Sequence, residues 1–183
     1  MTFDLLFVCT GNICRSPTAE LLAATRLPAE HFRVHSAGTY GLEGYGIEPG
    51  AARELTALGI DSAAFRARRL TPELVRDADL VLTATREHRS AVVTLDPKAL
   101  PRTFTMRELA RLLDHVEVPA GDDPADRARA LVAAVAAARG RHPAPDPRDE
   151  DVADPYGRGE AAYAAAIEDI TEALRRPLEV LAG

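Results

Sequence analysis

The chain has 183 residues, 46 % of them hydrophobic, and its formal charge at neutral pH is −6. This length and composition fit one domain with a hydrophobic core, and the acidic balance argues against nucleic acid as a partner, since binding to it needs a basic face. No stretch approaches the about 18 unbroken apolar residues of a membrane span, and the N-terminus lacks the pattern of a secretory signal. We therefore expect a cytoplasmic protein with no membrane partner.

The first half of the chain alternates between strand and helix signals. Residues 3–9 are predicted to form a buried strand because most of them are apolar. Ser16 then offers an N-cap hydroxyl, and Pro17 a preset first helical residue, for a helix to about residue 26. A second strand and a second helix follow, over residues 32–37 and from Pro49 to Gly59.

The alternation continues after the second helix. Thr71 and Thr85 are predicted to begin helices on either side of a third strand at residues 80–82. A short fourth strand at residues 103–104 leads into a capping box and a helix. This pattern predicts an α/β fold, a single-domain three-layer sandwich with a four-stranded parallel sheet. Ligands of such sheets bind beyond the carboxyl ends of the strands, where the first strand ends.

The last third of the chain is less regular. Asp123 is predicted to cap an alanine-rich helix, residues 143–151 to form a polar proline-rich linker outside the core, and a last helix to begin near Gly159. Pro177 is expected to kink or end that helix. We interpret residues from about 118 to 151 as a helical and proline-rich insertion in one domain that spans residues 1–183.

A thiol and an arginine share the turn between the first strand and the first helix, in the segment Cys9-Thr10-Gly11-Asn12-Ile13-Cys14-Arg15-Ser16-Pro17. Backbone N–H groups, the helix N-terminus and Arg15 would together stabilise a Cys9 thiolate and bind a phosphoryl group. Arg15 can hold two oxygens in a bidentate fork, Gly11 permits a tight turn, and Ser16 can donate to the thiolate. The segment therefore predicts a cysteine-based phosphatase that binds phosphate or another oxyanion in this loop.

An aryl leaving group also needs a proton donor. Four aspartates precede a proline, and this pairing is ordinary in turns and helix caps. Asp123 is explained as a cap and Asp96 by the end of a helix. Asp154 differs because Tyr156, which can stack on an aryl ring, follows it, and Asp146 remains the second candidate. The five histidines do not cluster with the cysteines at zinc spacing, so no metal or other cofactor is expected.

Residues 9–20, CTGNICRSPTAE, resemble the signature of the low-molecular-weight protein-tyrosine phosphatases, and residues 36–39, 67–73 and 154–156 resemble further motifs of that family. The resemblance implies a flavodoxin-like fold, Cys9 as nucleophile, Arg15 as phosphate clamp and Asp154 as general acid and base. It also implies that Ser36 braces Asn12 and that Cys14 can form a protective disulfide with Cys9. The substrate would contact Thr10, Gly11, Asn12, Ile13, Cys14, Ser16 and Tyr156.

The implied reaction is metal-independent hydrolysis of phosphotyrosine on a protein partner, through a phosphocysteine. Three alternatives remain. Phosphoarginine phosphatases of the same family typically carry threonine where this chain has Ile13. Arsenate reductases on this scaffold need cysteines beyond Cys14, and the chain has none. A phosphoprotein-binding module without activity would normally lack Cys9, Arg15 or the acid.

The chain also departs from the family at three places, one of which is the insertion at about residues 118 to 151. Phe65 stands where the family often has histidine behind the loop, and Gly157 replaces the second of two consecutive tyrosines. Tyr40 and Tyr45, after the second strand, are candidates to line the entrance of the site.

Overall fold

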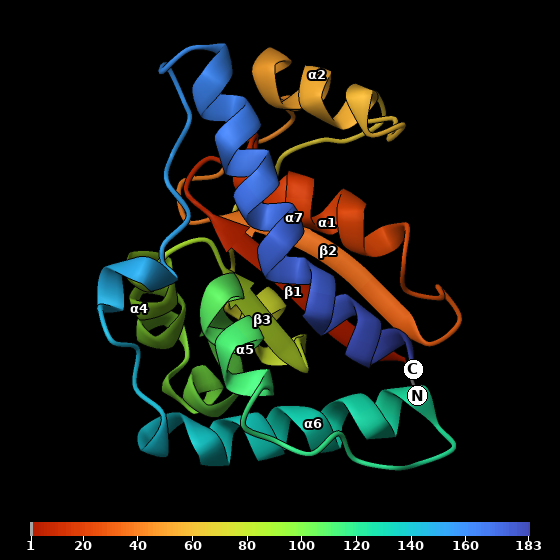
Figure 1. Cartoon of the computed structure of the whole chain (residues 1–183). Helices are drawn as coiled ribbons and strands as arrows, with labels where there is room; N and C mark the ends of the chain where they lie inside the picture. Colours follow the sequence, from red (N-terminus) through yellow and green to blue (C-terminus); the bar gives the residue numbers. More distant parts are fainter. Residues whose placement is uncertain (1) are drawn as a thin grey trace.

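The computed structural model describes residues 2–183. Its centre is a parallel sheet in the strand order β2-β1-β3-β4 (Figure 1). Each strand lies where the sequence predicts one, and the helices between strands allow the parallel pairing. The strands are β1 (Phe3–Cys9), β2 (Phe32–Gly38), β3 (Leu80–Thr83) and β4 (Thr103–Thr105).

Helices cover both faces of the sheet, so the predicted three-layer α/β arrangement is confirmed. Alternate residues of β1 enter two separate cores, Phe3, Leu5 and Phe7 on one face and Leu6 and Val8 on the other. The first core is closed by α1 (Arg15–Ala24), α5 (Met106–Leu113), α6 (Pro124–Ala138) and α7 (Glu160–Ala182). The second is closed by α3 (Pro72–Asp77), α4 (Arg86–Leu95) and the 3-10 helix η1 (Pro97–Arg102), while α2 (Pro49–Ala57) packs on α7.

Four helices begin with the side-chain cap that the sequence predicts. The hydroxyls of Thr71, Thr85 and Thr105 and the carboxylate of Asp123 each accept a hydrogen bond from a backbone N–H of the first turn. Thr105 also forms the predicted capping box with Glu108. Each cap stabilises its helix by about 1 kcal/mol, so these starts are set by local sequence.

The first helix begins differently from the prediction. α1 starts at Arg15, and its N-cap residue Cys14 makes no side-chain hydrogen bond to the helix. The prediction that Ser16 caps this helix is wrong, because its hydroxyl lies 3.0 Å from Cys9 Sγ and 2.9 Å from Asn12 Nδ2. No capping side chain therefore covers the N–H groups at this end of the helix, which leaves them available to an anion in the loop.

Two helix ends bear on the predictions. α1 ends at Ala24, close to the predicted end near residue 26. Of the two outcomes predicted for Pro177, an end of the last helix is wrong, because α7 continues to Ala182, and a kink stays a prediction. Proline removes one backbone donor from a helix. Buried leucines lie on both sides of this proline, at positions 174, 178 and 181, and their packing carries the helix past it.

The segment predicted as a polar linker contributes a buried charge. It contains the 3-10 helix η3 (Pro147–Glu150), and the buried Glu150 carboxylate lies 2.6 Å from Arg111 and 4.0 Å from Arg89. Guanidinium groups from two helices neutralise this carboxylate, so the prediction that the whole segment lies outside the core is wrong at this residue. A further 3-10 helix, η2 (Arg139–Arg141), follows α6. The interpretation of residues 118–151 as an insertion stays a prediction.

The carboxyl edge of the sheet brings the end of β2 against the loop that follows β1. A Cβ atom added at Gly38 would lie 2.4 Å from the carbonyl oxygen of Thr10 and 2.8 Å from the backbone nitrogen of Asn12. Glycine at this position therefore permits the close approach of the two segments. Within residues 2–183, no helix has the length and apolar character needed to cross a membrane.

Candidate active site

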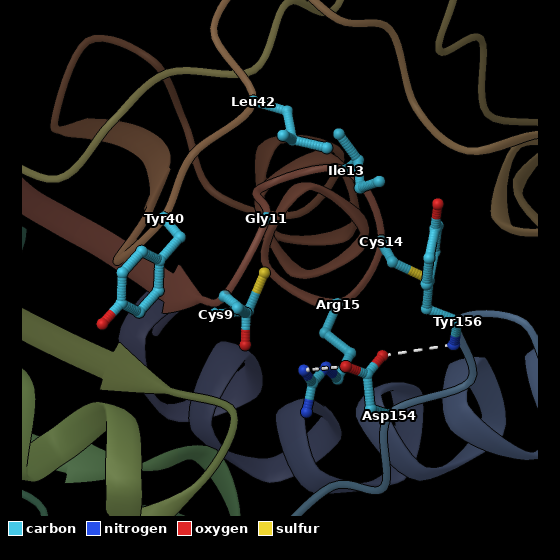
Figure 2. Close-up of a pocket in the computed structure, with 10 residues that line it drawn as sticks. Cys9, Gly11, Ile13, Cys14, Arg15, Tyr40, Leu42, Asp154 and Tyr156 are labelled. Atoms are coloured by element: carbon cyan, nitrogen blue, oxygen red, sulfur yellow. Dashed lines mark hydrogen bonds and ion pairs between the residues drawn. The ribbon is translucent and has the colours of Figure 1, made fainter.

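A cavity of about 240 Å³ opens at the carboxyl end of β1. Figure 2 shows Tyr40 and Tyr156 on opposite sides of it, with Ile13 and Leu42 above Cys9 in this view and the Arg15–Asp154 pair below. The structure thus brings residues from the two ends of the chain into one site. The lining residues are Cys9, Thr10, Gly11, Ile13, Cys14, Arg15, Tyr40, Leu42, Asp154 and Tyr156.

The backbone of the loop turns at Asn12. Its φ angle of 54° is the only positive φ of a non-glycine residue among residues 2–183. Asparagine tolerates this left-handed conformation better than most residues but still needs support from its surroundings. Asn12 is fully buried, and its amide bonds to three other segments: Oδ1 accepts from the backbone N–H of Arg68 at 2.9 Å, and Nδ2 donates to Ser36 at 2.7 Å and Ser16 at 2.9 Å.

These contacts constrain the hydroxyls of two serines. A backbone N–H can only donate, so the bond from Arg68 fixes the amide oxygen of Asn12 on that side and its NH₂ group toward the two serines. Ser36 accepts from the amide and donates to Glu20 Oε2 at 2.5 Å. Ser16 also accepts from the amide, and its own proton has two acceptors within reach, Cys9 Sγ at 3.0 Å and the carbonyl of Ala37 at 3.4 Å. The hydroxyl of Ser16 therefore lies where it can donate to Cys9 Sγ.

Arg15 is buried and points along the floor of the cavity. Its NH1 donates to the carbonyl of Val152 at 3.1 Å, and its NH2 lies 2.9 Å from Asp154 Oδ2 (Figure 2). Its Nε is buried without a hydrogen-bond partner among the described residues. An oxyanion above Cys9 would give this donor a partner and would compete with Asp154 for the guanidinium.

Asp154 is the only one of the four Asp-Pro aspartates that lines the cavity. Its side chain is 46 % exposed, so it borders solvent, and its Oδ1 accepts from the backbone N–H of Tyr156 at 3.2 Å. The other three cap helices elsewhere. Asp96 caps η1, Asp123 caps α6, and Asp146 caps η3 while pairing with Arg148 at 2.8 Å.

The two cysteines of the loop differ in environment. Cys14 is buried against Ala51, Tyr163 and Ile167. Burial, and then the negative charge of Cys9, raise the pKa of the Cys14 thiol to about 12. Cys14 is therefore protonated at neutral pH and does not compete with Cys9 as a nucleophile. Both cysteines are free thiols in this structure.

One residue behind the loop was not identified by the sequence analysis. His88, in the first turn of α4, is buried with Nε2 2.8 Å from Thr10 Oγ1 and Nδ1 2.8 Å from Thr85 Oγ1. Burial, and then the charge of Arg15, lower its pKa to about 4, so the ring is neutral at physiological pH. The contact with Thr10 joins residues 78 positions apart. No local pattern in the sequence signals such a pairing.

No group of three or more histidine, cysteine, aspartate or glutamate residues within the described part of the chain could hold a metal ion.

Residues 4–139 match a family model described as low molecular weight phosphotyrosine protein phosphatase. The chain belongs to this family. One relative, the low molecular weight protein-tyrosine-phosphatase Etp of Escherichia coli (strain K12), is 36 % identical over 116 residues, which are 63 % of this chain and 75 % of Etp. Another, a protein-arginine-phosphatase of Geobacillus stearothermophilus, is 39 % identical over 109 residues, which are 59 % of this chain and 72 % of that protein.

Solved structures of the family resemble the whole chain. A low molecular weight protein tyrosine phosphatase from T. tengcongensis has a TM-score of 0.70 at 27 % identity, covering 97 % of this chain and 99 % of that one. The YwlE arginine phosphatase from Geobacillus stearothermophilus has a TM-score of 0.69 at 30 % identity, covering 97 % and 91 %. The predicted flavodoxin-like fold is confirmed, and as a phosphatase of this family the chain is a hydrolase.

The neutral, buried state of His88 predicts a loss of stability in acid. The unfolded chain binds a proton at this ring near its ordinary pKa of 6.5, whereas the folded protein does so only near a pKa of about 4. Between these pH values the unfolded state holds more protons, so the free energy of unfolding falls as the pH is lowered, by about 3 kcal/mol in total from this group. His88→Gln removes the titration and keeps a donor for Thr10. Urea unfolding from pH 7 to pH 4 should show a steeper loss in the wild type, and equal slopes would contradict the assignment.

Proposed function

We propose that this enzyme hydrolyses phosphate monoesters of the phosphotyrosine type through a phosphocysteine, with Cys9 as nucleophile, Arg15 as phosphate clamp and Asp154 as general acid and base. The observation that carries the proposal is the meeting of these three residues in one cavity. The partner would be a tyrosine-phosphorylated protein, its phosphoryl group would occupy the loop, and the location would be the cytoplasm.

The first step forms the sulfur–phosphorus bond. The Cys9 thiolate attacks phosphorus while the ester oxygen leaves, and Asp154 gives that oxygen its proton. Asp154 is bonded to Arg15 in the structure, so the incoming oxyanion must take the guanidinium before the carboxyl group is free to turn to the leaving group. Uncovered N–H groups of the loop and of α1 stabilise the charge on the equatorial oxygens without reorganising.

The second step returns the enzyme to its starting state. Water attacks phosphorus, Asp154 as a carboxylate takes the proton of that water, and the bond from phosphorus to sulfur breaks. The departing thiolate of Cys9 needs stabilisation at this point. Ser16, whose hydroxyl lies 3.0 Å from Cys9 Sγ, supplies it by donating its proton to the thiolate.

Asp154→Asn is expected to lower kcat for p-nitrophenyl phosphate or a phosphotyrosine peptide by about 10²- to 10⁴-fold, because the leaving group loses its proton donor. Asp146→Asn is the matched control. That residue also precedes a proline, but it caps η3 away from the cavity, so its loss should leave kcat within about threefold of the wild type, as expected of a surface site. Cys9→Ser should abolish turnover. Full activity in Asp154→Asn with loss in Asp146→Asn would reverse the assignment of the acid.

The walls of the cavity favour an aryl phosphate. Ile13 and Leu42 form an apolar side, and the exposed rings of Tyr40 and Tyr156 flank the opening (Figure 2). A flat aromatic ring can stack on such rings and lose water from both faces. Hydrolysis of phosphoarginine is the second candidate, because a relative with 39 % identity over 109 residues is named as a protein-arginine-phosphatase.

Ile13→Thr tests the choice between these two substrates. A threonine hydroxyl in the cavity wall gives a polar partner to a guanidinium leaving group and weakens apolar contact with a phenyl ring. We expect kcat/KM for a phosphotyrosine peptide to fall about 10-fold, which corresponds to about 1.4 kcal/mol of lost contact, while the value for a phosphoarginine peptide rises. A wild type that prefers the phosphoarginine peptide of the same sequence would overturn the aryl assignment.

The second thiol of the loop suggests protection against oxidation. Peroxide converts the Cys9 thiolate to a sulfenic acid, and attack by the sulfur of Cys14 would form a disulfide and release water. Cys14 lines the same cavity as Cys9 and is otherwise inert, because its thiol is protonated at neutral pH. We propose that this exchange protects Cys9 from oxidation to the sulfinic acid.

Peroxide treatment followed by dithiothreitol should therefore restore most activity in the wild type and little in Cys14→Ser, because the variant has no partner for the sulfenic acid. Mass spectrometry should find a loss of two hydrogens in the oxidised wild type and added oxygens on Cys9 in the variant. Equal recovery in the two proteins would remove the protective role from Cys14.

A further inference from the structure

A buried carboxylate–imidazole pair behind the loop has no part in the proposed mechanism. Asp4 in β1 and His35 in β2 are both buried, with side chains 8 % and 9 % exposed, and His35 Nε2 lies 2.5 Å from Asp4 Oδ1. On its other side, His35 Nδ1 lies 2.7 Å from an NH2 of Arg68. The imidazole thus stands between a carboxylate and a guanidinium.

These two neighbours allow only one protonation pattern with both hydrogen bonds. A guanidinium has donors and no acceptor, so Nδ1 of His35 must accept from Arg68. The ring proton is then on Nε2 and is donated to Asp4. Asp4 in turn holds the ring in place, and its other oxygen is bonded to Arg33 at the surface.

Arg68 connects this pair to the loop. Its guanidinium is held by His35 and by the carbonyl of Ser36 at 2.7 Å, and its own carbonyl accepts from the backbone N–H of Gly38 at 3.0 Å. The backbone N–H of the same residue, Arg68, donates to Asn12 Oδ1. Arg68 is otherwise an exposed residue, and a long exposed side chain keeps its rotamer freedom unless buried groups fix it.

We propose that His35 is a positioning residue for the phosphate-binding loop. Held by Asp4, it fixes Arg68 so that the backbone of Arg68 presents its N–H to Asn12 and keeps the loop in its left-handed turn. This role rests on the proposed function in one respect, because it assumes that this loop binds the oxyanion.

Loss of the connection should weaken oxyanion binding before any chemistry takes place. The probe is inorganic phosphate, and the measurement is the phosphate concentration that halves the rate of Cys9 alkylation by iodoacetate. The first alkyl group reports on Cys9, because the high pKa of about 12 keeps the Cys14 thiol protonated. His35→Leu and Arg68→Leu each remove a hydrogen bond that involves a charged group, and the half-protecting concentration should rise about 10-fold or more.

Two further variants separate positioning from general damage. In His35→Gln, the side-chain oxygen can accept from Arg68 and the NH₂ group can donate to Asp4, as the two ring nitrogens of the histidine do. Its half-protecting phosphate concentration should therefore stay within about threefold of the wild type. Arg33→Gln removes a surface partner of the same Asp4 carboxylate without touching Arg68, and it should also stay within about threefold, as expected of an exposed ion pair. Thermal unfolding of the four variants and of the wild type is measured alongside phosphate protection.

The proposal is overturned if folded His35→Leu and Arg68→Leu are protected at the wild-type phosphate concentration, or if Arg33→Gln loses as much protection as they do. If His35→Leu fails to fold, Arg68→Leu decides, because its side chain lies at the surface and leaves the buried pair of Asp4 and His35 in place. Alkylation and phosphate protection require no turnover. Failure of this proposal is therefore distinct from failure of the proposed function, which would appear as hydrolysis that survives Cys9→Ser.

Discussion

The three hydrogen bonds of the Asn12 amide tie the loop to the three segments that surround it. Ser16 belongs to α1, Ser36 to β2, and Arg68 to the stretch before α3. Together they stabilise the left-handed conformation of Asn12, a backbone state that costs about 1–2 kcal/mol in most residues. The same amide donates to the hydroxyl of Ser16, which lies 3.0 Å from Cys9 Sγ, so the turn of the loop and the surroundings of the Cys9 thiol depend on one side chain.

Asp154, the proposed acid, is positioned beside this loop by a second set of contacts. The backbone N–H of Val152 donates to the carbonyl of Ala84 at 2.8 Å, and its own carbonyl accepts from Arg15. Two residues earlier, Glu150 is buried between arginines of α4 and α5, and Asp151 accepts from the backbone N–H of Arg86 at 2.7 Å. These charged contacts anchor the chain immediately before Asp154. Beyond these contacts, Asp154 and Tyr156 are exposed.

Much of the fold and part of the site could be predicted because their signals are local. Strands, capped helices and the thiol-bearing turn each occupy a few consecutive residues, and Thr105 with Glu108 forms its capping box from four positions. The choice of acid among four similar aspartates needed a family resemblance, since Asp-Pro caps helices as readily as it serves a site. The burial of Glu150 could not be predicted from its neighbours in sequence, because its charge is stabilised by arginines about 40 and 60 residues earlier.

The ion pair of Arg15 with Asp154 also connects substrate binding to the acid in the proposed mechanism. In the structure, NH2 of Arg15 lies 2.9 Å from Oδ2 of Asp154. A phosphoryl dianion that binds Arg15 competes with this carboxylate, because both accept hydrogen bonds from the same guanidinium. Release from Arg15 leaves the side chain of Asp154 free to turn to the leaving group. In the proposed mechanism, substrate binding thus prepares the group that protonates the departing oxygen.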